Sequence, residues 1–250
     1  MKVTFLGTGT SRGIPVIACN CRICTSTDPK NKRLRCSVLV ESGATIVIDS
    51  SADFRFQMLK FNVQQLDAVV FTHSHVDHIL GLDDVYPFNA RSGKSLPIYA
   101  SEETLKEIKI TFRYLFNSHR YTGIPEIRAV PIEGKFTIAD LEFEPISLLH
   151  GKLPILGFRI GDFAYLTDTS FIPEASFEQL KGLRFLALDA LRYRSHPTHF
   201  SLSEAVKAAQ LIGAEETYLI HMSHDVDHTE GSAFLPERIS LAYDGLVLEL

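Results

Sequence analysis

The run FTHSHVDHILG, residues 71–81, constrains this chain more than any other feature. It places His73, His75, Asp77 and His78 within six positions, directly after the apolar stretch LDAVVF. A strand that ends here directs His73 and His75 to one side, and the turn that follows brings Asp77 and His78 toward the same point. Imidazoles and carboxylates are the usual ligands of catalytic first-row metals. The run predicts a metal site at the end of a buried strand; a solvated histidine-rich loop is the simpler alternative.

HSHVDH matches the HxHxDH signature of the metallo-β-lactamase superfamily, so the chain resembles that group of hydrolases. The resemblance implies further ligands downstream, and three candidates each follow an apolar run: His150 in SLLHG, Asp168 in AYLTDTS and His221 in TYLIHMSH. Taken singly, an aspartate after a strand is more often a cap or turn residue. In the superfamily's order, all three are expected to be ligands.

The resemblance implies two divalent cations, with zinc, manganese or iron as candidates. One is expected to be held by His73, His75 and His150, the other by Asp77, His78 and His221, with Asp168 shared by both.

A second cluster lies near the N-terminus, where Cys19, Cys21 and Cys24 form CNCRIC. Three thiols this close are not easily bridged to one another, whereas zinc with a fourth ligand explains the spacing. His224 in HMSH is the candidate fourth ligand, and a reduced loop without metal is the alternative. The Cys3His arrangement resembles that of the PhnP-type cyclic phosphodiesterases, and this resemblance covers nearly the whole chain. Cys36 is expected to be a small core residue of a strand.

The resemblance implies an α/β fold, the four-layer αββα sandwich, as a single domain over residues 1–250; periodicity alone indicates only α/β. Expected helices cover residues 103–116 and 201–213. Expected strands cover residues 3–7, 37–42, 45–50, 67–73, 96–101, 142–150, 156–161, 163–168, 184–190, 217–222 and 246–250.

Composition favours a cytoplasmic enzyme. The chain has four cysteines, three of them assigned to a metal, which argues for a reducing compartment. It has no apolar stretch of about 18 residues, and its first residues read as a strand rather than a secretory signal. A formal net charge of −5 argues against binding to nucleic acid or to an anionic membrane.

Two glycine and aspartate motifs follow early strands. GTGTSRG, residues 7–13, lacks the Lys-Ser/Thr and the long helix of a phosphate loop, so a tight turn that approaches the metal edge is expected. Asp49 in IVIDSS is expected to orient ligand histidines, with a helix cap as the alternative.

Residues 189–205 carry the remaining chemistry. The family resemblance places His199 at the position of a catalytic histidine that binds no metal, and His199 and Asp77 are the expected catalytic residues. A plain helix-flanking histidine is the alternative for His199, and His196 is expected to be a loop residue. Arg192, Tyr193 and Arg194 are candidates to grip a distal phosphate, although charged loops are usually only solvated.

Residues 111–125 are rich in aromatic side chains, which indicates either a lid over the metal cleft or a homodimer surface.

The resemblance implies a dinuclear metal-dependent phosphodiesterase that acts on a small phosphorylated substrate, such as 5-phosphoribosyl 1,2-cyclic phosphate. Two alternatives stay open: a nuclease similar to those that process transfer-RNA 3′ ends, and a metal-binding protein of cofactor biosynthesis similar to PqqB. β-Lactam and thioester hydrolysis fit the ligand set less well.

Overall fold

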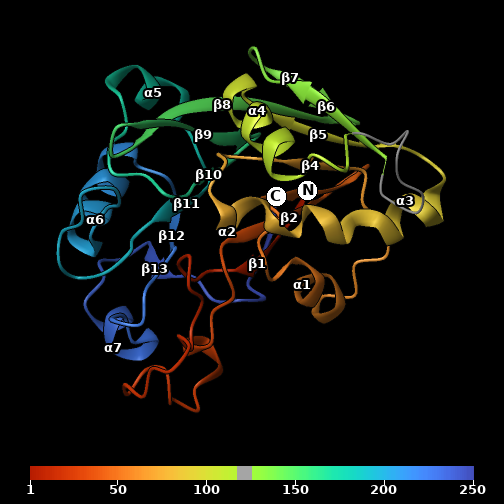
Figure 1. Ribbon diagram of the computed structural model, residues 1–250. Helices are drawn as coiled ribbons and strands as arrows, with labels where there is room; N and C mark the ends of the chain where they lie inside the picture. The colour runs from red at the N-terminus through yellow and green to blue at the C-terminus, as the bar shows by residue number, and fades with distance from the viewer. Residues whose placement is uncertain (117–125) are drawn as a thin grey trace.

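The computed structural model describes residues 1–116 and 126–250. Within them, the strands form two seven-stranded sheets (Figure 1). The first sheet has the order β14 (Val247–Glu249), β1 (Lys2–Gly7), β2 (Ser37–Glu41), β3 (Thr45–Ile48), β4 (Ala68–Val70), β5 (Leu96–Ala100) and β6 (Ile127–Pro131). The second has the order β13 (Ile239–Leu241), β12 (Glu216–Ile220), β11 (Phe185–Asp189), β10 (Phe163–Leu166), β9 (Leu153–Ile160), β8 (Leu141–His150) and β7 (Phe136–Ile138).

Helices cover the outer face of each sheet, so the layers follow the expected order αββα (Figure 1). The first sheet is covered by α1 (Phe54–Lys60), α2 (Val76–Ile79), the 3₁₀ segment η2 (Leu80–Val85), α3 (Tyr86–Ser92) and α4 (Glu102–Thr111). The second is covered by α5 (Glu174–Gln179), α6 (Leu202–Ile212) and α7 (His228–Ala233), and a short 3₁₀ segment, η1 (Pro29–Asn31), lies in the cysteine loop.

The central strands are apolar throughout because both of their faces are covered. Every residue of β3, β10 and β11 is buried, as continuous apolar runs in an αββα protein require. The core between the sheets contains aromatic rings from the second sheet, including Phe143, Phe158 and Phe163. Cys36 lies in this core, as expected.

The terminal strands close the first sheet. Strand β14 pairs antiparallel with β1, and the Met1 amino group donates to the Leu250 carbonyl oxygen at 2.8 Å. Figure 1 shows the two termini side by side at the centre of the molecule.

The expected strands are present, and α6 matches its predicted range. Ser201 caps α6 through a capping box with Glu204, and Gly213 ends it in the left-handed region at φ 71. The prediction for the earlier helix was too long, because α4 ends at Thr111. Strands β6, β7 and β13 were missed; they are short, and β6 is only half-buried, so their apolar pattern is weak.

Most of the segment 111–125, the predicted lid or homodimer surface, lies outside the described residues. No helix in the described ranges is long and apolar enough to span a membrane. The single-domain organisation stays a prediction.

Candidate metal centre

Strand ends deliver the predicted histidines and aspartates to one edge of the two sheets. His73, Asp77 and His78 follow β4, His150 ends β8, Asp168 follows β10 and His221 follows β12. Asp49, Asp168 and His221 each leave their strand in the left-handed region, at φ 63, 55 and 60. Non-glycine residues rarely adopt this conformation, and active sites are one of the places where it recurs.

Asp168 is the centre of the cluster. Its Oδ1 lies 3.3 Å from Nε2 of both His78 and His221, and its Oδ2 lies 3.9 Å from Nε2 of His73. Asp77 Oδ2 lies 3.2 Å from His78 Nε2 and 4.0 Å from His221 Nε2. These four side chains around Asp168 are all buried.

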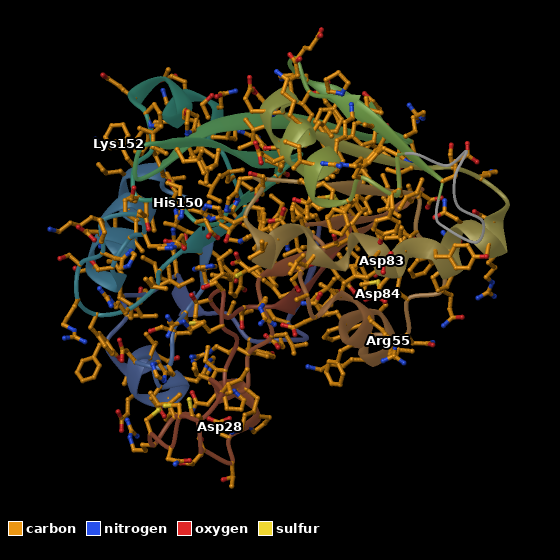
Figure 2. The ribbon with its side chains drawn as sticks, viewed as in Figure 1. Asp28, Arg55, Asp83, Asp84, His150 and Lys152 are labelled. Atoms are coloured by element: carbon orange, nitrogen blue, oxygen red, sulfur yellow. The ribbon has the colours of Figure 1, made fainter. Side chains whose placement is uncertain are left out.

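His75 and His150 complete the cluster on its other side. One donor atom of each of His73, His75 and Asp168 lies within 4.8 Å of the other two. The ring of His150 lies 5.0 Å from that of His75 and 5.7 Å from that of His73, measured between centroids. In Figure 2, His150 points into the molecule from the end of β8, whereas Lys152 on the same hairpin points outward.

Asp49 orients two of the histidines from behind, as predicted. Its Oδ2 lies 2.8 Å from His78 Nδ1 and accepts a hydrogen bond from the Thr72 hydroxyl at 2.9 Å. The Thr72 oxygen lies 3.0 Å from His73 Nδ1, and because its own hydrogen is donated to Asp49, it accepts a hydrogen bond from that ring nitrogen. The alternative of a helix cap does not hold, because Asp49 precedes α1 by five positions and Asp53 is its N-cap residue.

Metal ions fit this donor set. With Nδ1 of His73 and His78 engaged behind, the Nε2 atoms of both rings present lone pairs toward carboxylate oxygens, which are also acceptors. Nε2 of His73, His78 and His221 are buried and make no hydrogen bond within the described part of the chain. Only a cation or added protons can satisfy so many converging acceptors.

The local pKa shifts show the same concentration of charge. Burial disfavours protonation of His78, but the carboxylates of Asp168, Asp49 and Asp77 outweigh it and raise its pKa well above the ordinary value. Burial also acts to raise the pKa of Asp168, but positive charge on His221 and His78 lowers it well below the ordinary value. Burial lowers the pKa of His73.

His199 lies at the edge of the cluster, with one donor atom within 4.8 Å of donor atoms of His150 and Asp168. Its ring stacks on His221 at 4.7 Å and meets His150 edge-on at 4.6 Å, and burial lowers its pKa. Asp189 ends β11 behind it. Asp189 Oδ1 lies 3.2 Å from His199 Nδ1 and 3.4 Å from His221 Nδ1, and its Oδ2 accepts from the Phe200 amide at 3.0 Å.

The sequence analysis gave Asp189 no function. The signal was nevertheless present, because Asp189 ends a buried apolar strand in the same way that Asp49 and Asp168 follow theirs.

The three thiols and His224 form a separate cluster. Sγ of Cys19, Cys21 and Cys24 lies 3.3, 3.6 and 3.4 Å from His224 Nδ1. Tetrahedral zinc with ordinary bond lengths sets such ligand atoms about 3.5 Å apart. Backbone hydrogen bonding from Cys24 lowers the pKa of the Cys21 thiol to about 6, which favours the thiolate form that binds metal.

The GTGTSRG turn approaches the metal edge, as expected. The Thr10 amide donates to the Met222 carbonyl and the Met222 amide donates to the Thr8 carbonyl, each at 3.1 Å, directly beside His221. A Cβ on Gly7 would lie 2.0 Å from the Arg35 carbonyl oxygen, so only glycine permits this approach.

Residues of the 192–196 loop take different positions. Arg192 and His196 line a cavity that reaches His199. Tyr193 instead lies over α7, where its hydroxyl is 3.3 Å from the place a Cβ on Gly231 would take, and Arg194 does not line the cavity.

Comparison with known proteins agrees with this architecture. The family model of the beta-lactamase superfamily domain matches residues 44–222. The crystal structure of a new diphosphatase from the PhnP family is 42% identical, with a TM-score of 0.94 over 100% of this chain and 97% of that chain. Zn²⁺-bound PqqB from Methylobacterium extorquens shares the fold, with a TM-score of 0.81 at 18% identity over all of both chains.

Two curated relatives carry other names. The octanoyltransferase of Porphyromonas gingivalis is 40% identical over 98% of this chain and 51% of that protein. The ribonuclease Z of Crocosphaera subtropica is 29% identical over 65% of this chain and 48% of that protein. The chain thus spans about half the length of these relatives.

The matches decide the family. The chain belongs to the β-lactamase superfamily and, within it, to the PhnP family. Its fold is the metallo-β-lactamase fold, which implies divalent metal ions, and the histidine–aspartate cluster is the group of side chains able to hold them.

Proposed function

We propose that the protein is a metal-dependent phosphodiesterase whose substrate is a small phosphorylated molecule, with 5-phosphoribosyl 1,2-cyclic phosphate as the specific candidate. The observation that carries this proposal is the convergence of buried, unsatisfied imidazole Nε2 atoms on Asp168. Phosphoryl transfer needs little covalent chemistry from the protein. It depends mainly on cations held where negative charge develops, and this cluster of side chains is suited to hold such cations.

The chain offers two overlapping ligand sets. His73, His75, His150 and Asp168 would hold one divalent cation, and Asp77, His78, His221 and Asp168 the other. Zinc and manganese both accept this mixture of imidazole and carboxylate. When bound, such a cation pair supplies Lewis acidity to a phosphoryl group and lowers the pKa of water at the site.

His199 supplies the proton that the leaving alkoxide needs. Asp189 holds His199 Nδ1, so the proton available to the substrate sits on the other ring nitrogen. The ring contacts of His199 with His150 and His221 support this function, because a substrate held at the cluster would lie within its reach. Asp77 is the second expected catalytic residue. Its Oδ2 lies 4.0 Å from His221 Nε2, on the side of that ring away from Asp189, and it would orient the reacting phosphoryl group.

The Cys19/Cys21/Cys24/His224 cluster would hold a structural zinc. Four protein ligands leave no open position for substrate. His224 lies three positions after His221, so this zinc would fix the loop that carries a catalytic ligand.

The relatives' names bear on substrate choice. A diphosphate that is esterified at both ends and a cyclic phosphodiester both present a phosphorus with two bridging oxygens and a single negative charge. The name diphosphatase is therefore compatible with the same chemistry. The name octanoyltransferase belongs to a protein of which this chain spans only 51%, so the name is not carried over.

RNA and a noncatalytic function are the remaining candidates. The net charge of −5 argues against an RNA partner. A metal-binding protein similar to PqqB would hold cations without turnover.

We expect the protein to be cytoplasmic, and to have no membrane partner. Residues 111–125 are proposed as a lid or a homodimer surface; a monomer in solution would remove the second proposal.

A substrate panel tests the proposal. The protein, loaded with zinc or manganese, is assayed with a cyclic phosphodiester, a linear phosphodiester, a doubly esterified diphosphate and a transfer-RNA precursor. We expect turnover of the cyclic diester above the RNA, loss of turnover with a chelator, and recovery when metal is restored. Full metal occupancy without hydrolysis of any member would leave the noncatalytic candidate; preference for RNA would establish the nuclease.

A further inference from the structure

A cavity of about 290 Å³ lies beside the histidine–aspartate cluster. Its wall comes from the loop after β1, through Thr10, Ser11 and Arg12, and from the loop after β11, through Arg192 and His196. His199 lines the same cavity, so the cavity opens directly onto the proposed proton donor.

The two arginines of this cavity have no acidic partner among the described residues. Arg12 is exposed, and no hydrogen bond or ion pair joins its side chain to another described residue. Arg192 is half-buried, and it donates only to the backbone carbonyls of Arg194 at 3.3 Å and Ser195 at 3.2 Å. Those two bonds orient the guanidinium and leave its positive charge uncompensated.

The charged side chains that line the cavity are mainly positive, whereas the chain as a whole is negative. Asp225 at the rim is the one carboxylate among the described lining residues, against two guanidinium groups. In a protein with a net charge of −5, this is a local excess of positive charge next to a hydrolytic centre. The charge of Arg192 reaches His196 and His199 as well, since it contributes to the lowered pKa of both.

We propose that Arg12 and Arg192 form a second anion subsite, which binds a terminal phosphate of the substrate while its phosphodiester lies at the histidine–aspartate cluster. Guanidinium groups suit this task because their planar donors match phosphate oxygens. The cavity volume is at the lower limit for small-molecule sites, which favours a sugar phosphate over a nucleic acid strand. This inference rests on the proposed function and adds to it the two specificity-determining residues.

Two matched ligands and two matched variants test the subsite. The ligands are 5-phosphoribosyl 1,2-cyclic phosphate and ribosyl 1,2-cyclic phosphate, which differ only in the terminal phosphate. The variants are Arg12→Ala, which removes a side chain that makes no hydrogen bond or ion pair with another described residue, and Arg194→Ala, which removes an arginine of the same region outside the cavity. Ribose 5-phosphate binding, measured by calorimetry, gives a readout independent of turnover.

We expect the wild type to favour the phosphorylated diester in kcat/KM by roughly 10-fold to 100-fold, the effect of one or two charge-assisted hydrogen bonds. Arg12→Ala should reduce this ratio and weaken ribose 5-phosphate binding about 10-fold or more, with Arg12→Lys intermediate. Arg194→Ala should keep both values.

The possible failures are distinguishable. If the wild type hydrolyses neither diester but Arg12→Ala still weakens ribose 5-phosphate binding, the proposed function is wrong and the subsite stands. If the diesters are hydrolysed at equal kcat/KM, or if Arg12→Ala alters neither the ratio nor the binding, the subsite is refuted. A selective loss with Arg194→Ala alone would also overturn the assignment.

Discussion

Three of the seven described non-glycine residues with positive φ belong to the candidate site. Asp49, Asp168 and His221 have φ values of 63, 55 and 60. A left-handed conformation costs a non-glycine residue about 1–2 kcal/mol, so the surrounding structure must hold each of them in place. Each side chain turns back toward the cluster at the end of its strand. The strain is therefore the local consequence of directing three polar side chains to one point.

His199 is the residue on which the proposed proton transfer depends. We expect His199→Ala to reduce kcat by roughly 10²–10⁴-fold and to leave the metal content unchanged, because His199 Nδ1 is engaged by Asp189. Turnover and metal content are measured on the same preparation. Unchanged turnover would remove His199 from the mechanism. Arg194→Ala, at a neighbouring loop residue outside the cavity, serves as the control.

Asp49 acts on the metal centre through His78 and Thr72. Asp49→Asn replaces the carboxylate that faces the His78 ring and the Thr72 hydroxyl with a neutral amide. The negative charge behind the His78 ring is then lost. We expect metal affinity at the cluster to fall about 10-fold to 100-fold. Titration with a competing chelator measures this, and Asp53→Asn, at the aspartate that pairs with Arg35, is the matched control. Wild-type affinity in Asp49→Asn would show that the hydrogen bond to His78 does not tune the centre.

At the scale of elements, the loop between β1 and β2 connects both clusters. It carries the three cysteines of the thiol cluster. Near its start, Thr8 and Thr10 form backbone hydrogen bonds with the amide and the carbonyl of Met222. Its far end contributes Arg33, a fully buried arginine whose Nη1 donates to the Val226 carbonyl at 2.8 Å. The loop is thus held to the segment that follows β12 by backbone bonds, a buried arginine and the thiol cluster.

Loss of one thiol should affect stability before activity. We expect Cys21→Ala to lose the zinc of the cysteine cluster and to lower Tm by about 5 °C or more. The histidine–aspartate cluster lies outside this loop, so its metal content should be retained. Thermal unfolding and metal analysis check both statements. Cys36→Ala removes the one cysteine thiol that lies outside the cysteine cluster and is the control for zinc content. Equal zinc content and Tm in Cys21→Ala and wild type would contradict the prediction.

Helix α7 begins at a histidine that folds in its neutral form. Burial, with the positive charges of Lys30 and Arg33, lowers the pKa of His228 to about 4, although Asp28 and Asp227 oppose this. The unfolded chain, with a histidine pKa of about 6.5, binds the proton first as pH falls. His228 should therefore lower the free energy of unfolding progressively between pH 6.5 and pH 4.

His228→Phe removes that titration and keeps the ring beside Tyr243. We expect the variant to lose less stability than wild type on acidification from pH 7 to pH 4, measured by denaturant unfolding at each pH. Parallel pH dependence of the two proteins would show that His228 titrates equally in the folded and unfolded states.

At the scale of the whole molecule, sequence analysis predicted what apolar runs and ligand spacing encode. The apolar runs predicted an α/β fold with long central strands, and ligand spacing predicted the first histidines and aspartate of the metal edge. The αββα layers and the ligands further along the chain were implied by the family resemblance. Strands β6, β7 and β13 were not predicted, because short edge strands owe their existence to pairing with neighbours rather than to their own pattern. Asp189 was missed for a related reason: its function depends on two histidines, 10 and 32 positions later, that only the folded sheet brings to it.

The cavity with Arg12 and Arg192 was beyond sequence analysis in the same way. The two arginines are 180 positions apart, and they lie in loops that follow strands of different sheets, β1 and β11. Arg192 was considered together with Tyr193 and Arg194, since neighbouring residues in a loop look equivalent in a sequence. Folding separates them, because α7 packs beneath Tyr193 and the cavity receives Arg192.

We infer that the cluster around Asp168 is a hydrolytic metal centre. Phosphorus NMR in ¹⁸O-labelled water, with metal-loaded wild type and Asp168→Ala on 5-phosphoribosyl 1,2-cyclic phosphate, tests it most directly. We predict that wild type opens the ring and places one ¹⁸O on the new phosphomonoester, whereas Asp168→Ala loses its cluster metals and gives no product. A wild-type rate from Asp168→Ala, or no ring opening by wild type with its metals bound, would contradict the account.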